Sequence, residues 1–251
     1  MQNKIYKLLL IIGIFCCAWH SNAQKFINAA RVEYERKTYI KKIMQEMSDA
    51  DDNNAEYMAR MPDYRTEYFD LLFSGNKSVY KTGKESDQKI SEWMSAGIIS
   101  TVYTNMDSNS YHSQKQVYDK NYNIIDSLPH IDWKITDDTR TIAGFTCRKA
   151  TGRFCDSLFI VAFFSEEILL SGGPETFNGL PGLILGLVIP RMHVSWYAIK
   201  VDFPEIKPEQ ITPPATKKGK HTTLKAMLKE LGENVNDWGK WKNSLMWQAA
   251  M

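Results

Sequence analysis

Two cysteines stand close enough along the chain to bond with each other. Cys147 and Cys155 occur in FTCRKATGRFCDS. If residues 150–152 form a three-residue hairpin loop with Gly152 in the left-handed conformation, the cysteines face each other at a separation that suits a disulfide. A two-residue Thr151-Gly152 turn would shift the pairing by one residue and place the sulfurs on opposite faces. We favour the disulfide between Cys147 and Cys155, because an exported chain meets an oxidising compartment.

The other residues that could act as acids, bases or nucleophiles form no catalytic pattern. A cysteine nucleophile needs a base beside it, and no histidine stands in a sequence typical of a cysteine protease. The carboxylates of Glu166-Glu167 would point to opposite faces of a strand, where they are poorly placed to act on one bond. We therefore expect no catalytic residue. The alternative is a hydrolase or metal-dependent enzyme with a site assembled from distant residues, among them His112, His130, His193, Glu166 and Glu167.

Metal ligands are also sparse. No two histidines lie within a helical turn or a short strand spacing of each other, so nothing in the spacing predicts a zinc site. His193 and several methionines offer soft ligands for copper(I), but methionines at helical spacing are far more often core or interface residues. These methionines are Met44, Met47, Met58, Met61 and Met192. The sequence predicts neither a metal site nor a cofactor.

The glycine-rich stretch SGGPETFNGLPG is best explained as backbone architecture. It lacks both glycine spacings that cradle phosphates, GxGxxG and GxxxxGK[ST]. Pro181 has a fixed φ and Gly182 tolerates a positive φ, so residues 180–183 match a type II turn. The apolar run LILGLVI that follows predicts a strand covered on both faces. Gly186 within this run predicts a bend, a bulge or a close neighbour.

The N-terminal segment has the three-part layout of a secretory signal peptide. Two lysines precede the apolar run 8–15, and Ser21 and Ala23 stand three residues and one residue before the expected cleavage point at Gln24. The run ends too early for a spanning helix, which needs about 20 apolar residues. We expect cleavage of residues 1–23 and export to the periplasm, an outer-membrane-associated position or the extracellular space. No transmembrane anchor is expected after cleavage.

The charge balance argues against nucleic acid as a partner. Cleavage would remove two of the 31 basic residues and none of the 29 acidic residues, which leaves 29 of each. A nucleic-acid-binding protein needs a concentrated basic surface, and the lysine cluster at 216–225 is more typical of a solvated linker. The hydrophobic fraction of 43% and the seven tryptophans suffice for a sizeable core.

Most of the chain alternates in the manner of β-strands. In RVEYERK, Val32 and Tyr34 face one side and the glutamates between them face the other. Similar segments, HIDWKIT among them, follow one another without helices in between, which favours an antiparallel sheet. The fold class expected is mainly β (α+β), a curved antiparallel sheet or half-barrel-like meander with an inserted N-terminal helix and C-terminal helices. Its divisions are a β domain at 24–203 with a helical insertion near 38–61, a Pro/Lys-rich linker at 204–220 and a helical segment at 221–251, in which Gly232 ends the first helix.

One hexapeptide carries a family resemblance. Gly179, Leu180, Pro181, Gly182, Leu183 and Ile184 read GLPGLI, and WKIT at 133–136, TIAGFTCRKAT at 141–151 and the ending NAQ of the N-terminal segment accompany it. The chain thereby resembles the GLPGLI family, a group of exported Bacteroidetes proteins, most closely over residues 132–201. It departs from the family pattern in AFFSEEILLSGGP, ahead of the hexapeptide. The resemblance implies export and a mainly β fold, and the family offers no assigned activity, catalytic residue or cofactor to carry over.

The function expected is therefore binding. Aromatic residues are abundant in the strand-like segments, and no reactive cluster stands out. These features favour an exported, non-catalytic, envelope-associated protein that binds a protein partner or an apolar ligand on the concave face of its sheet.

Overall fold

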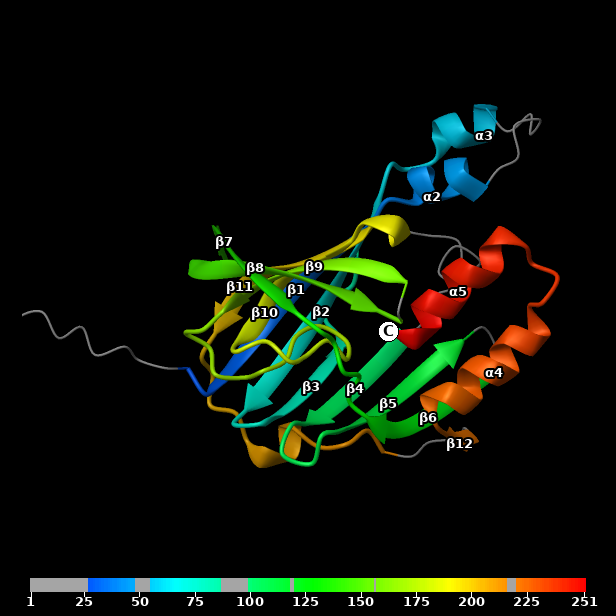
Figure 1. Cartoon of the computed structure of the whole chain (residues 1–251). Helices are drawn as coiled ribbons and strands as arrows, with labels where there is room; N and C mark the ends of the chain where they lie inside the picture. The colour runs from blue at the N-terminus through cyan, green and yellow to red at the C-terminus, as the bar shows by residue number, and fades with distance from the viewer. Residues whose placement is uncertain (1–26, 48–54, 87–98, 118–119, 156, 216–219) are drawn as a thin grey trace, which may run out of the picture.

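The chain folds around an open β-sheet (Figure 1). The computed structural model describes residues 27–47, 55–86, 99–117, 120–155, 157–215 and 220–251. Neighbouring strands are antiparallel except β12 and β6, which run parallel, so the mainly β fold class is confirmed and the sheet is mixed. In their order across the twelve-stranded sheet, the strands are β12 (Lys220–Thr222), β6 (Lys120–Ser127), β5 (Ser110–Val117), β4 (Ile99–Asn105), β3 (Lys77–Thr82), β2 (Arg65–Ser74), β1 (Ala29–Thr38), β11 (Val194–Asp202), β10 (Leu183–Ile189), β9 (Leu158–Ser165), β8 (Phe145–Phe154) and β7 (Lys134–Ile142).

The expected signal peptide, residues 1–23, lies outside the described residues. Among the helices that are described, none combines the length and the apolar character needed to cross a membrane.

Side chains alternate between the two faces of the sheet, as the sequence predicts. In β1, Ala30, Val32 and Tyr34 are buried, and the residues between them are only partly covered. In β10, six of the seven residues are buried. This strand is therefore covered on both faces, which confirms the interpretation of LILGLVI.

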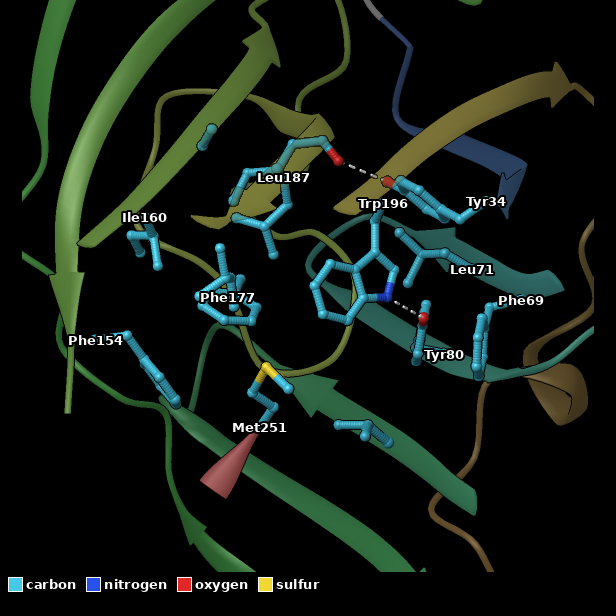
Figure 2. Close-up of a cluster of buried hydrophobic side chains, with 14 of the residues drawn as sticks. Tyr34, Phe69, Leu71, Tyr80, Phe154, Ile160, Phe177, Leu187, Trp196 and Met251 are labelled. Carbon is cyan, nitrogen blue, oxygen red and sulfur yellow. Dashed lines mark hydrogen bonds between the residues drawn. The ribbon is translucent and has the colours of Figure 1, made fainter. Parts of the chain in front are cut away.

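The sheet curls, and its buried face is the concave one (Figure 1). Trp196 lies at the centre of the core, where its Nε1 donates a hydrogen bond to the Tyr80 hydroxyl over 3.2 Å (Figure 2). The Tyr34 hydroxyl donates to the Ile184 carbonyl over 2.7 Å. These bonds give the polar ends of large aromatic side chains partners inside an apolar interior.

Helices α2 (Ile40–Met47) and α3 (Ala55–Arg60) form the insertion expected near 38–61, and they project from the sheet (Figure 1). A hydrogen bond of 2.8 Å between Glu46 and His193 Nε2 links α2 to the turn before β11.

The C-terminal region returns to the sheet before it becomes helical. After the short helix η4 (Pro208–Gln210), β12 adds an edge strand beside β6. Thr223 Oγ1 then caps α4 (Leu224–Asn234) by accepting a hydrogen bond from the Ala226 amide. The prediction that Gly232 ends this helix is wrong, because α4 continues to Asn234. A glycine inside a helix costs only about 1 kcal/mol, and burial of the neighbouring Leu231 outweighs it.

The strand expected in HIDWKIT begins later than its alternation indicates. β7 starts at Lys134, and the residues before it form no regular element. Trp133 Nε1 instead donates to the Asn178 carbonyl over 2.8 Å, which ties this segment to the loop before β10.

The predicted hairpin and disulfide are wrong. β8 runs without interruption through residues 150–152, and the turn to β9 follows at Cys155, whose φ is 49°. Cys147 and Cys155 consequently lie eight residues apart along one extended segment, about 26 Å at 3.3 Å per residue, whereas a disulfide needs Cα atoms within about 7 Å. Both cysteines are thiols rather than halves of a disulfide, with Cys147 buried and Cys155 exposed.

The two thiols should differ in reactivity. Burial raises the pKa of the Cys147 thiol to about 11, and an alkylating reagent attacks the exposed thiolate. We expect iodoacetamide to label Cys155 in the native protein and Cys147 only after unfolding, as located by peptide mass spectrometry. A Cys147–Cys155 disulfide in the non-reduced digest would contradict the structure.

Candidate functional site

The GLPGLI hexapeptide forms a tight turn at the start of β10, but the turn is not of type II. The Gly182 amide donates to the Leu180 carbonyl over 2.8 Å, which closes a three-residue turn around Pro181. The φ of Gly182 is +146°, far from the value of about +80° of a type II turn. The Leu183 amide, which would close a type II turn, instead donates to Ile168.

Close packing explains why glycine occupies position 182. A Cβ atom there would overlap the Ser165 carbonyl oxygen, because the turn passes directly over the end of β9. Gly186 in β10 lies at the β-bulge that the sequence allowed for, and its missing side chain makes room for the Tyr197 ring and Ile142. The motif residues are thus structural, and none of them offers a reactive group.

The turn also closes the loop between β9 and β10. Ser171 Oγ donates to the Leu180 carbonyl over 2.7 Å, and the Gly179 amide donates to the Ser171 carbonyl. The loop held in this way carries Glu175 and Phe177, which both point into the buried interior. The hexapeptide therefore positions side chains that lie just before it.

Gly182→Ala should destabilise the fold severely. We expect a loss of at least about 3 kcal/mol in the free energy of unfolding, or no folded protein, because the added methyl group meets backbone atoms that cannot move aside. Gly75→Ala is the control. Gly75 also has a positive φ, of 56°, but its Cβ would meet nothing within 4 Å, so the expected loss is about 1 kcal/mol. Urea unfolding measures both, and equal losses would contradict this explanation.

An interior charged cluster lies on the concave face, formed by Arg36, Arg65, Glu67, Glu175 and Lys115. Arg36 donates to Glu67 Oε2 through Nε and Nη2, over 2.9 and 2.7 Å. Arg65 Nε lies 3.0 Å from the same oxygen, and Arg36 Nη1 lies 3.6 Å from Glu175. Burial disfavours the charged form of Glu67, but the two arginines outweigh it and lower the pKa of this carboxyl.

Lys115 on β5 receives the end of α5 (Lys240–Ala250). Its ammonium group donates to the Ala249 carbonyl over 3.1 Å, and the side chain is 2% exposed. Thr176 Oγ1 donates to the Met251 carbonyl over 3.5 Å. The last turn of α5 therefore points end-on into the concave face, and Figure 2 shows Met251 beside Phe177. We call Lys115, Thr176, Phe154 and Phe177, which surround this turn, the α5 seat.

Burial of the Lys115 ammonium group lowers the stability of the fold by an amount that depends on pH. Burial lowers its pKa to about 8, although the charge of Glu175 opposes the shift. An unfolded lysine titrates near pH 10.4.

The residues considered for an assembled enzyme site do not come together. His130 lies 3.0 Å from Asp132, and Glu166 accepts a hydrogen bond from Arg148 on the exposed surface. His193 pairs with Glu46 beside α2. Within the ranges that the structure describes, no three His, Cys, Asp or Glu side chains are placed to hold a metal ion.

The sequence interpretation missed the charged side chains that face the interior. Arg36 had a usable signal, because the alternation of Val32 and Tyr34 continues to it and predicts an inward-facing side chain. Lys115 had a weaker one, since YHSQKQV alternates around polar residues on both faces. Glu175 lies in a loop and had no periodic signal.

Comparison with known proteins identifies the fold and no family. No family model matches the chain, and no curated protein matches it. Two solved structures of PNGF-II, in the P21 and C2 space groups, resemble it with TM-scores of 0.51 and 0.50 at 12% identity. They cover 81% and 88% of this chain, which spans only 33% of theirs. An uncharacterized conserved protein from Thermus thermophilus aligns with a TM-score of 0.40 at 6% identity, over 79% of this chain and 93% of its own.

The structure itself defines the class of protein, an open, mainly β sheet fold. At 12% identity the likeness to PNGF-II concerns the fold alone. The chain corresponds to about a third of that longer protein.

Lys115→Met should change how stability depends on pH. Between about pH 8 and pH 10.4 the unfolded wild-type chain keeps a proton on Lys115 that the folded chain has lost, so wild-type stability rises with pH. The methionine variant lacks this rise, which amounts to roughly 3 kcal/mol over the interval. Urea unfolding of both proteins from about pH 7 to about pH 10.5 measures the difference, and parallel curves would show that Lys115 titrates normally.

Proposed function

We propose that this chain is an exported, non-catalytic, envelope-associated protein of the GLPGLI kind, and that it binds an apolar ligand inside its curled sheet. The signal-peptide layout of residues 1–23 and the letter-for-letter hexapeptide support export and the family. The scatter of the surveyed histidines and glutamates leaves the enzyme alternative without an observation in its favour.

The observation that carries the proposal is the way in which the interior is closed. The buried residues of α5 are Leu245, Ala249 and Ala250, followed by the buried Met251, and its first turns are largely exposed. Met246 and Trp247 also pack against the core, so the helix enters the interior with its second half and its tip lies deepest. The proposed ligand, a single alkyl chain, would take the place of this tip.

The walls around the tip are apolar. Phe154 and Phe177 lie with ring centroids 5.0 Å apart, and Leu187 and Trp196 lie in the same cluster (Figure 2). An alkyl chain in the place of Met251 would keep these side chains away from water, which is the main source of affinity in apolar sites.

The likeness to PNGF-II is compatible with a binding module. The fold forms about a third of that longer chain, so it occurs beside other protein segments. Nothing about the activity of PNGF-II is carried over to this chain.

Single-chain alcohols should stabilise the protein. We expect 1-dodecanol, at about a hundredfold excess over its Kd, to add about 2.7 kcal/mol to the free energy of unfolding, or roughly 5–10 °C in Tm. Trp241→Ser is the control. It removes a 40%-exposed side chain at the outer end of α5, so the shift should persist. Loss of the shift in this variant would indicate surface binding. The absence of any shift would contradict ligand binding and leave a protein partner as the function.

A further inference from the structure

We propose that the outer face of the sheet around β9 is a second binding site, which takes an extended segment of a protein partner that carries two carboxylates with an apolar side chain between them. β9 is the third strand from the β7 edge of the sheet (Figure 1). The site lies on the opposite face of the sheet from the interior apolar site and does not depend on it.

The outer face of β9 exposes an apolar stripe. Every second residue of this strand is fully buried in the core, whereas Phe159, Val161 and Phe163 between them point to the outer face. Phe159 is 52% exposed. Val188 of β10 pairs with Val161 and is likewise only partly covered. Exposed apolar side chains that are bordered by polar residues are typical of protein interaction sites.

An arginine lies at each end of this stripe. Arg153 of β8 is exposed and pairs directly with Phe159. The guanidinium carbon of Arg140, on β7, lies 5.0 Å from the centre of the Phe163 ring and 5.1 Å from that of Tyr197. Arg140 also donates to the Tyr197 hydroxyl over 3.3 Å. Because these contacts hold Arg140 in place, a partner that binds it pays little side-chain entropy.

The charges of the two arginines are not compensated by the surrounding surface. Arg148 and Lys149 of β8 form ion pairs with Glu166 and with a carboxylate of β7. Within the described residues, Arg140 and Arg153 form no such pair. A carboxylate is the natural partner of an arginine, because its two oxygens match the fork of the guanidinium group. Arginine beside aromatic rings is also the composition in which the binding energy of protein interfaces concentrates.

The positions of the arginines define the spacing of the partner's charges. Phe159 and Phe163, beside which the arginines lie, are four residues apart on β9, about 13 Å at 3.3 Å per residue. An extended partner chain has the same rise, so two acidic residues four positions apart would reach both arginines from one face of that chain. The residue midway between them would lie over Val161 and Val188. The partner's pattern is therefore acidic-x-apolar-x-acidic.

Three acetylated and amidated peptides test the site. TETITET has both glutamates on one face of an extended chain, TQTITQT replaces them by glutamine, and TETIETT places them on opposite faces. Each is titrated at low ionic strength into the isotope-labelled full chain, and Kd is measured from NMR shifts. We expect TETITET to bind about tenfold more tightly than TQTITQT, the amount typical of two exposed ion pairs, with TETIETT between them and the shifts centred on β8 and β9.

Two arginine variants and one matched control assign this preference to residues. Arg140→Gln and Arg153→Gln should each lower the preference for TETITET to about threefold, and the double variant should abolish it. Arg148→Gln removes the same charge from an arginine that is already paired with Glu166, and should retain the full preference. Phe159→Ser should weaken all three peptides alike, because it removes apolar contact and no charge.

The outcomes separate this inference from the proposed function. Equal Kd values for TETITET and TQTITQT, equal values for TETITET and TETIETT, or a preference that survives the double variant overturn the acidic-segment site. Binding to phosphatidylglycerol vesicles without binding of any peptide also overturns it, because the arginines would then serve a lipid surface. The stabilisation expected from 1-dodecanol should persist in all of these outer-face variants, so its presence or absence tests the interior site alone.

Discussion

Burial of the last turn of α5 inside the curled sheet is the constraint on which the rest of the structure depends. The two outer strands, β12 and β7, do not pair with each other, so the sheet cannot cover its own concave face. The tip of α5 covers what the strands leave open, and it brings unpaired helix carbonyls into an apolar interior. Lys115 and Thr176 provide the donors that these carbonyls need. A buried lysine follows directly from closing a sheet with the end of a helix.

The GLPGLI hexapeptide also shapes this interior, through the loop between β9 and β10. Its tight turn over Ser165 fixes the loop between β9 and β10, and that loop delivers Thr176 and Phe177 to the tip of α5. Glu175, in the left-handed conformation with a φ of 54°, reaches Arg36 from the same loop. A motif without reactive groups thereby helps to place Glu175, one member of the interior charged cluster.

The alternation of side chains in the sequence was enough to predict the strands, but it was not enough to predict which residues meet in the interior site. Alternation in RVEYERK and the continuous apolar run of LILGLVI predicted β1 and the buried strand β10, because burial of strand side chains has a period of two. The same local reasoning failed at residues 150–152, where Gly152 suggested a turn and pairing of β8 with both neighbours kept the strand straight. The α5 seat joins β5, the loop after β9 and the last helix, which are far apart in sequence, so no spacing rule could assemble it. Arg36 was the residue most readily predicted, by continuing the alternation of β1, and Lys115 had a weaker signal of the same kind.

Hydrogen exchange in α5 tests most directly whether its tip occupies the place of a ligand. The amides of residues 245–250 would be followed by mass spectrometry in the full chain, with and without saturating 1-dodecanol, and the amides of β10 would serve as an internal reference. Displacement of the tip predicts faster exchange in α5 on binding, with β10 unchanged or slower. Bound 1-dodecanol with α5 as protected as before would contradict it, because the ligand would then lie elsewhere on the protein.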